Sequence, residues 1–97
     1  MTLLDVHVVT PEEEVWAGDA DFLIARSVGG EIGILPGHEP VLAVLAPGPL
    51  IIRKQGGDVS AVVDGGFLSV AEAHGRTRVD VLAEHFQSSE NISEPDG

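Results

Sequence analysis

The sequence predicts an all-β fold, a β-sandwich or flattened barrel of about nine or ten short strands. Runs rich in Val, Ile, Leu and Phe are short, segments rich in Gly and Pro separate them, and the periodicity of an amphipathic helix is nearly absent. With 97 residues, of which 43% are hydrophobic, the chain has the size of one domain with one core. We therefore expect a single sandwich domain over residues 1–86.

The first strand is predicted over residues 3–9, where apolar and polar side chains alternate. Leu4, Val6 and Val8 would face the core, and the residues between them would face outward. Thr10-Pro11 would end this strand, because proline fixes its φ angle and lacks the N–H group that a ladder needs.

Two further short strands follow this turn. One is predicted over residues 14–17 and is expected to close at Gly18-Asp19. The next is predicted over residues 20–26, with Phe22 and Ile24 facing the core.

Glycine and proline residues set the limits of the next two strands. Gly29-Gly30 permits a tight hairpin into a strand over residues 32–35. Pro36-Gly37 breaks that strand, and after a loop another strand is predicted over residues 41–45.

Turn signals also separate the strands of the C-terminal half. Residues 46–49 contain two prolines and predict a rigid turn, and Gln55-Gly56-Gly57-Asp58 is a strong hairpin signal. The strands expected around these turns cover residues 50–54, 59–64, 67–70 and 77–82.

The C-terminal segment, residues 87–97, is polar and acidic and contains one apolar residue. It cannot bury enough apolar surface to offset the entropy lost on ordering, so it is predicted to be a disordered acidic tail. At the other end, the first residues contain no basic stretch followed by an apolar run, so no signal peptide is expected.

The formal net charge is −11, from 16 acidic and 5 basic residues. Such a surface repels nucleic acid and anionic lipid headgroups, so we expect no nucleic-acid partner and no direct insertion into lipid. A protein partner with basic patches would be attracted, although acidity of this kind also simply keeps a protein soluble. Cysteine is absent, which excludes disulfides and thiol chemistry.

No catalytic motif is present. The chain lacks a phosphate-binding P-loop and a serine-hydrolase elbow, and its four histidines lie far apart in sequence. His38-Glu39 is the closest approach to a metal-ligand pair, and it would need partners from elsewhere. We therefore expect no cofactor and no metal, and a binding module rather than an enzyme.

Two other classes of small acidic β-protein remain as alternatives. A cupin-like metal-binding β-sandwich enzyme needs several His and Glu ligands at set spacing, and only His38-Glu39 comes close. A carrier domain of the lipoyl or biotinyl type needs a modifiable lysine at a hairpin tip, and Lys54 lies at a strand end just before Gln55-Gly56-Gly57.

The segment at 30–40 reads Gly-Glu-Ile-Gly-Ile-Leu-Pro-Gly-His-Glu-Pro and resembles the signature of the epsilon subunit of rotary F-type ATP synthases. Without that resemblance, it indicates a hairpin with a proline-closed strand end, on which Glu31 and His38 are simply solvated. Further segments resemble the same family in the same order along the chain. They are Val8-Val9-Thr10-Pro11-Glu12, Val15-Trp16-Ala17-Gly18, Pro47-Gly48 with the following Leu50-Ile51-Ile52-Arg53, Gly65-Gly66-Phe67-Leu68-Ser69-Val70 and Val79-Asp80-Val81-Leu82-Ala83.

The resemblance implies a ten-stranded β-sandwich in the central stalk. Such a subunit binds the gamma subunit and the c-ring, rotates with gamma, and couples proton flow through the ring to ATP synthesis without catalysing a reaction itself. It would lie at the cytoplasmic face of the bacterial cell membrane as a peripheral part of the complex.

The resemblance also implies the contact residues. Glu31 and His38 match the positions that contact the loops of the c-ring. The residues that match the gamma-facing edge of the family are Thr10, His38, Glu39, Pro40, Val41 and Ala43.

One part of the family pattern is not matched. Most epsilon subunits continue into a helical hairpin that inhibits ATP hydrolysis, whereas the residues after Phe86 have no helical pattern. Inhibition by C-terminal helices is therefore not expected of this sequence.

Overall fold

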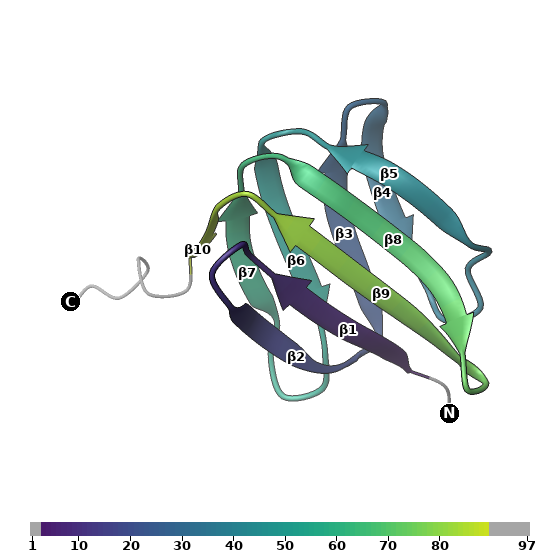
Figure 1. The fold of residues 1–97 in the computed structure, drawn as a ribbon. Coiled ribbons are helices and arrows are strands. Elements are labelled where there is room, and N and C mark those ends of the chain that lie inside the picture. Colours follow the sequence, from purple (N-terminus) through teal and green to yellow (C-terminus); the bar gives the residue numbers. More distant parts are fainter. Residues whose placement is uncertain (1–2, 90–97) are drawn as a thin grey trace.

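The computed structural model describes residues 3–89, which form strands and turns arranged in two layers (Figure 1). The strands are β1 (Leu4–Val9), β2 (Glu14–Ala20), β3 (Phe22–Ser27), β4 (Gly30–Ile34), β5 (Val41–Leu45), β6 (Gly48–Arg53), β7 (Val59–Val63), β8 (Gly66–Ala73), β9 (Arg76–Ala83) and β10 (Phe86–Ser88). The predicted all-β sandwich or flattened barrel is confirmed, with ten strands.

The strands pair in the order β10-β7-β6-β3-β5-β8-β9-β1-β2, and β4 pairs with β3 beside this path. In Figure 1, β5, β8, β9, β1 and β2 form the front layer, and the other strands lie behind them. The layers are joined where Ser27 of β3 pairs with Leu45 of β5. β10 and β2 end the path, and β4 pairs with β3 alone among the described strands, so the flattened barrel is open at these edges.

The pairing is antiparallel throughout the described strands, with one exception. β1 and β9 are parallel, and Leu4 lies opposite Thr77 at one end of this pair while Val9 lies opposite Leu82 at the other. The first strand therefore lies between β9 and β2, in the interior of the front layer.

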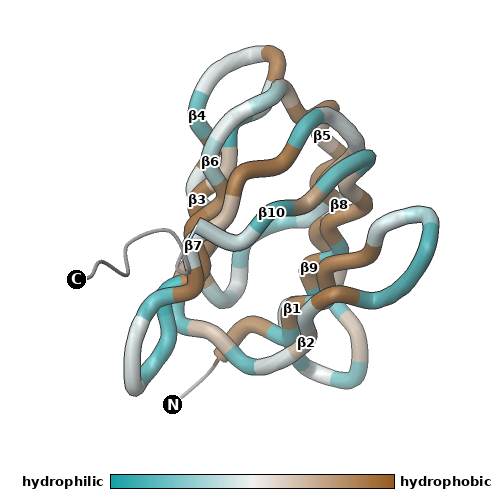
Figure 2. Tube along the Cα trace, turned by 90° about the vertical axis from the view of Figure 1, so that its left-hand side faces the viewer, coloured by the Kyte–Doolittle hydropathy of each residue, from teal (hydrophilic) through white to brown (hydrophobic). Residues whose placement is uncertain are grey.

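The core lies between the two layers, and Figure 2 shows apolar segments on both of them. Leu4, Val6 and Val8 are fully buried, as the alternation in the first strand predicts. In the back layer the largest fully buried side chains include Leu23, Ile34, Leu50 and Ile52, and in the front layer they include Leu68, Val79 and Val81. Because buried and exposed residues alternate along the strands, each layer has one apolar face, and the two apolar faces pack against each other.

The prediction that Phe22 and Ile24 face the core is wrong. Leu23 and Ala25 are the buried residues of β3, and Phe22 and Ile24 are only partly buried. The ring of Phe22 covers Gly33 of the neighbouring strand β4, so closely that a Cβ atom on Gly33 would lie 3.1 Å from the ring. An aromatic ring over a glycine thus buries apolar surface on the outer face, and this does not follow from an apolar run.

Several strands extend further than predicted. β2 continues through Gly18-Asp19 to Ala20, because β1 pairs with it along its whole length. β6 begins at Gly48 and includes Pro49, since β3 pairs only with Ile51, Ile52 and Arg53 of that strand. β8 and β9 are also longer, and His74-Gly75, both with positive φ, form the two-residue turn between them.

The ordered chain also continues beyond residue 86. Gln87 and Ser88 lie in β10, which pairs with β7, and the Ser89 N–H donates to the Ser60 carbonyl at 2.9 Å. These residues are ordered by backbone pairing and not by apolar side chains of their own. Beside them, Phe86 packs against the core. The rest of the predicted acidic tail, residues 90–97, lies outside the described residues.

Truncating a core leucine should destabilise the sandwich much more than truncating a surface leucine. Leu50 is fully buried, whereas Leu42 of β5 is 70% exposed. We expect Leu50→Ala to lower the free energy of unfolding by about 2–5 kcal/mol and Leu42→Ala by less than about 1 kcal/mol. Urea titrations followed by circular dichroism would measure both, and equal losses would contradict this assignment of the core.

Candidate protein-interaction site

Glu31 lies on the hairpin formed by β3 and β4, opposite Arg26 in the register of the two strands. The turn of this hairpin is held by its own side chain, because the Ser27 hydroxyl donates to the Gly30 carbonyl at 2.7 Å and accepts the Gly29 N–H at 3.2 Å. Gly30 has a φ of 126°, which other residues rarely adopt. The Glu31 carboxylate is therefore exposed on a rigid hairpin next to the turn.

His38 lies in the loop between β4 and β5. Its backbone N–H donates to the Leu35 carbonyl at 3.0 Å, and its ring Nδ1 lies 2.7 Å from the Glu39 carbonyl oxygen. A carbonyl oxygen only accepts hydrogen bonds, so Nδ1 carries the proton in this contact. In the neutral ring Nε2 is then the acceptor, and the loop presents this atom to a hydrogen-bond donor on a partner.

Thr10 lies in the turn between β1 and β2. Its N–H donates to the Glu13 carbonyl at 2.9 Å, and its hydroxyl donates to the same oxygen at 3.3 Å. The turn is therefore closed on itself, and it projects from the end of the front layer where β1 ends (Figure 1).

The structure brings some of the predicted contact residues together and separates others. His38, Glu39 and Pro40 form one loop that leads directly into β5. Glu31 and His38 lie toward opposite ends of β4, and the turn with Thr10 lies on the other side of the molecule from the loop with His38 (Figure 1). The predicted residues thus form three separate groups.

The two predicted residues on β5 point toward the core. Val41 and Ala43 are partly buried and alternate with Leu42 and Val44, which are 70% and 47% exposed. On this strand Leu42 and Val44 are therefore the residues that a partner would reach first.

A row of apolar side chains crosses the outer face of the front layer near Thr10. Val44 of β5 pairs with Phe67 of β8, Phe67 pairs with Leu82 of β9, and Leu82 pairs with Val9 of β1. Val44, Phe67 and Leu82 are each nearly half exposed, at 47%, 48% and 49%. We call these four residues the outer apolar row. The sequence does not reveal this row, because its members lie on four strands and share no motif.

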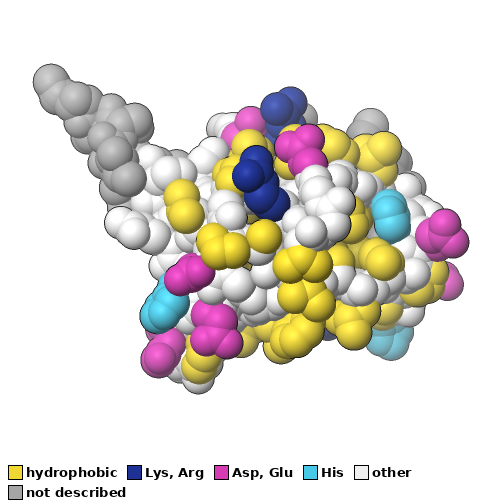
Figure 3. All heavy atoms as spheres, turned by 90° about the horizontal axis from the view of Figure 1, so that it is seen from above, with side chains coloured by type: hydrophobic (Ala, Val, Ile, Leu, Met, Phe, Trp, Pro, Cys, Tyr) yellow, Lys and Arg dark blue, Asp and Glu magenta, His cyan; other side chains and the backbone are white. Residues whose placement is uncertain are grey.

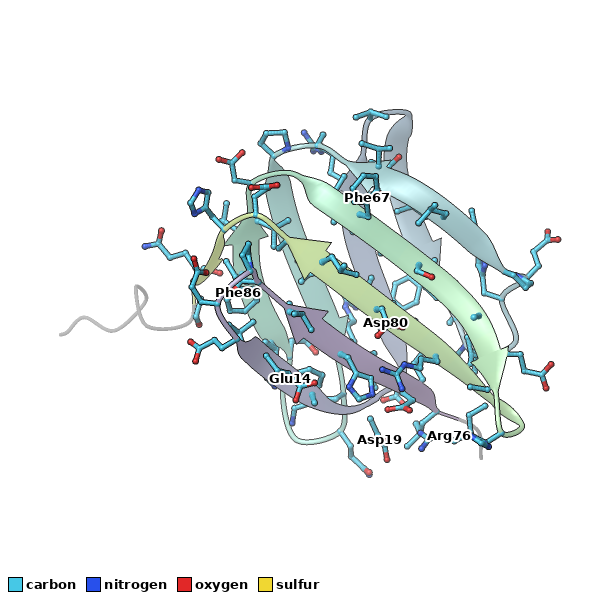
Figure 4. All side chains as sticks on the ribbon, viewed as in Figure 1. Glu14, Asp19, Phe67, Arg76, Asp80 and Phe86 are labelled. Atoms are coloured by element: carbon cyan, nitrogen blue, oxygen red, sulfur yellow. The ribbon has the colours of Figure 1, made fainter. Side chains whose placement is uncertain are left out.

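The outer apolar row borders a shallow hollow of about 370 Å³. The hollow is lined by Val9, Thr10, Pro11, Gly66, Phe67, Leu82, Ala83 and Glu84. In Figure 4, Phe67 lies near the upper end of the front layer. Figure 3 shows the molecule from above, and hydrophobic side chains gather there along its lower side, which is the side that faces the viewer in Figure 1. An exposed apolar surface of this kind is a candidate site for contact with another protein.

Along β9, toward the end of the front layer away from the outer apolar row, lie two ion pairs. Arg78 contacts the Asp80 carboxylate at 3.1 Å, which raises the pKa of Arg78, and Arg76 contacts Asp19 at 2.8 Å, which raises the pKa of Arg76. Asp19 and Arg76 lie close together in Figure 4. Exposed pairs add little stability, and each pair is neutral overall, so the acidic excess of the whole chain sets the sign of the charge that a partner meets.

His7 lies between two carboxylates on the same face. Its Nε2 lies 3.0 Å from Asp5 Oδ1, and its Nδ1 lies 3.1 Å from Glu14 Oε2. These contacts connect β1 to the start of β2 and fix the imidazole ring.

The two alternative readings find little support in the described part of the chain. Among residues 3–89, no group of three or more His, Asp or Glu side chains is placed to hold a metal ion, as a cupin-like enzyme would require. Lys54 is partly buried and precedes the β6–β7 turn, and its carbonyl accepts the Gly57 N–H at 3.2 Å. It does not project from the tip of the hairpin, as a lysine of a carrier domain does. No helix within residues 3–89 is long and apolar enough to cross a membrane.

Residues 3–89 match the model of the β-sandwich domain of the ATP synthase delta/epsilon chain. The chain belongs to this family. A relative named ATP synthase epsilon chain in Thermobifida fusca is 50% identical over 92 residues, which cover 92% of this chain and 65% of that protein. The ATP synthase epsilon chain of Frankia casuarinae is 51% identical over 80 residues, which cover 81% of this chain and 89% of that protein.

Solved structures agree with the family assignment. A chain of the Euglena gracilis mitochondrial ATP synthase, in a complex that includes the c-ring, superposes with a TM-score of 0.83 at 25% identity and covers 96% of this chain and 57% of that one. A chain of the Tetrahymena thermophila mitochondrial ATP synthase central stalk and c-ring shares the fold, with a TM-score of 0.75 at 19% identity. The chain thus spans about two thirds of the Thermobifida epsilon chain and slightly more than half of the Euglena chain.

Proposed function

We propose that this chain is a non-catalytic rotor subunit of a proton-translocating F-type ATP synthase, where it links the gamma subunit to the c-ring. The observation that carries the proposal is the outer apolar row beside Thr10, an exposed protein-binding surface on a delta/epsilon-family sandwich. The epsilon-chain relatives and the stalk and c-ring complexes among the similar structures support the assignment.

In this proposal the gamma subunit covers the outer apolar row. The centre of a stable interface is apolar and its rim is polar, and the row with its hollow supplies such a centre. Thr10 lies at its edge, and Leu42 extends it along β5 toward the loop that contains His38, Glu39 and Pro40. The acidic residues around it favour a basic surface on gamma, because opposite potentials steer the encounter.

The c-ring would contact Glu31 and His38. The Glu31 carboxylate would accept a charge-assisted hydrogen bond from a basic loop residue, and His38 Nε2 would accept one from a second donor. Since the two residues lie toward opposite ends of β4, we infer that they contact two different loops of the ring. A ring built from identical subunits offers the same loop at regular intervals and suits this arrangement.

The sandwich would act as a stiff connection. Each strand of the front layer except β2 is bonded to two neighbours, and the layers enclose a close-packed core. A force applied at one face is therefore carried by many backbone hydrogen bonds and by a core of low compressibility. In this role the subunit passes torque from the ring to gamma, catalyses no reaction and lies peripherally at the cytoplasmic face of the bacterial cell membrane.

The proposal is tested by adding the chain back to ATP synthase in native membranes from which it has been removed. The double variant Glu31→Ala/His38→Ala should bind the depleted complex at least about tenfold more weakly, since a hydrogen bond to a charged group contributes about 1.5–3 kcal/mol. ATP synthesis driven by a proton gradient should fall with it, while the unfolding midpoint of the isolated chain should stay near that of the wild type.

A matched control removes one carboxylate and one imidazole at other positions. Asp58 lies at the β6–β7 turn and His85 precedes β10, and both are exposed. The double variant Asp58→Ala/His85→Ala should bind and couple like the wild type. If the two double variants lose binding equally, Glu31 and His38 are not the ring contacts, and if the wild-type chain does not bind the depleted complex, the rotor assignment fails.

A further inference from the structure

Thr77 is the only buried polar or charged side chain among residues 3–89, with 7% of its surface exposed. It lies in β9, between Leu4 of β1 and Glu72 of β8 in the register of the front layer. It shares the inward face of β9 with Val79 and Val81, so its hydroxyl points between the two layers. Burying a hydroxyl in this position costs folding free energy unless the hydroxyl is hydrogen-bonded.

The hydroxyl of Thr77 accepts the N–H of Gly37 at 2.7 Å. Gly37 lies in the loop that follows β4, and β4 belongs to the back layer (Figure 1). Within residues 3–89, this is the only recorded side-chain hydrogen bond that joins the loop at 35–40 to another part of the fold. It thus connects this loop to the opposite layer of the sandwich.

Three hydrogen bonds in sequence then determine where the His38 ring lies. The Gly37 backbone N–H donates to the Thr77 hydroxyl, and the His38 backbone N–H donates to the Leu35 carbonyl. Nδ1 of the His38 ring donates to the Glu39 carbonyl. Gly37 has a φ of 90°, which is open to glycine and strained for other residues, so this backbone path is defined. The direction of His38 Nε2 therefore depends on a residue that lies forty positions further along the chain.

We propose that Thr77 is a positioning residue for partner binding, which holds the loop at 35–40 so that His38 Nε2 and Glu39 meet the partner in one fixed geometry. This inference rests on the proposed function, because the partner is the gamma and c-ring assembly. A loop that is ordered before binding loses less conformational entropy when the partner arrives, and this raises the affinity. Thr77 itself is buried and touches no partner.

The test compares Thr77→Val with Thr77→Ser. Valine has nearly the shape of threonine and suits a buried strand, but it cannot accept the Gly37 N–H, whereas serine can. Amide hydrogen exchange of the full chain, followed by NMR, should show Gly37 exchanging at least about tenfold faster in Thr77→Val, while the amides of Val6 and Val79 keep the wild-type rate. Thr77→Ser should exchange like the wild type.

The binding measurement uses the same depleted membranes as the rotor test. Thr77→Val should bind about fivefold more weakly than the wild type, and Thr77→Ser should restore the affinity. Unchanged exchange at Gly37 would overturn the proposed hydrogen bond, and faster exchange with wild-type affinity would overturn the positioning role. Absence of binding by the wild-type chain would instead overturn the rotor assignment and the positioning role together.

Discussion

Replacing Gly66 by alanine is expected to leave most of the protein unfolded. Gly66 begins β8 with a φ of 118°, and a Cβ atom there would overlap the carbonyl oxygen of Leu82 and lie 3.0 Å from the Cα atom of Ala83. All of these neighbours are backbone atoms of β9, so relief requires β8 to move away from the strand with which it pairs. We expect a loss of more than about 4 kcal/mol, comparable to the whole stability of many small domains.

Gly29 provides the matched control, because it lies just before the first residue of a strand, β4, and does not have a positive φ. A Cβ atom there would meet nothing closer than the Ser27 hydroxyl at 3.8 Å, so Gly29→Ala should change stability by less than about 1 kcal/mol. Circular dichroism spectra and urea titrations of both variants would measure the difference. A Gly66→Ala chain that unfolds at the wild-type urea concentration would show that β8 and β9 do not approach each other as described.

A charge in the outer apolar row should strongly weaken binding to gamma. Val44 is in the row and 47% exposed, and Val62 of β7 is equally accessible at 52% but lies in the other layer. We expect Val44→Asp to weaken binding to the isolated gamma subunit at least about 30-fold, since a residue at the centre of an interface contributes about 2 kcal/mol or more. The aspartate would be buried there without a partner.

Val62→Asp makes the same chemical change outside the outer apolar row. Its affinity should stay within about threefold of that of the wild type, and titration calorimetry with purified gamma would measure both variants. Thermal unfolding of each variant separates a lost contact from a lost fold. Equal weakening by the two substitutions would mean that net charge, and not the apolar row, governs the interaction.

Alternation and turn chemistry predict most of this fold from sequence. The strand over residues 4–9 needs only the spacing of Leu4, Val6 and Val8, since side chains two residues apart share a face. The hairpin at Gln55-Gly56 follows from glycines that adopt positive φ. These features are local, so the residues concerned carry the necessary information themselves.

The features that could not be predicted depend on contacts between distant residues. Phe22 is an outer residue because Gly33 of another strand leaves room for its ring, and a short strand such as β10 forms because β7 offers a free edge. Similarly, Val44 and Phe67 become neighbours only when the register of β5 and β8 is known. The family resemblance supplied Glu31 and His38 as contact residues, and their role stays a prediction.

The parallel pair of β1 and β9 also affects how this chain is made. Leu4 leaves the ribosome before any of the strands β2 to β9, and its neighbour Thr77 follows only when β9 is made. Until β9 is made, β1 has β2 beside it but an open edge on the other side. Folding of the front layer therefore waits until β9 has been made, and a nascent chain stalled before β9 exposes an aggregation-prone edge.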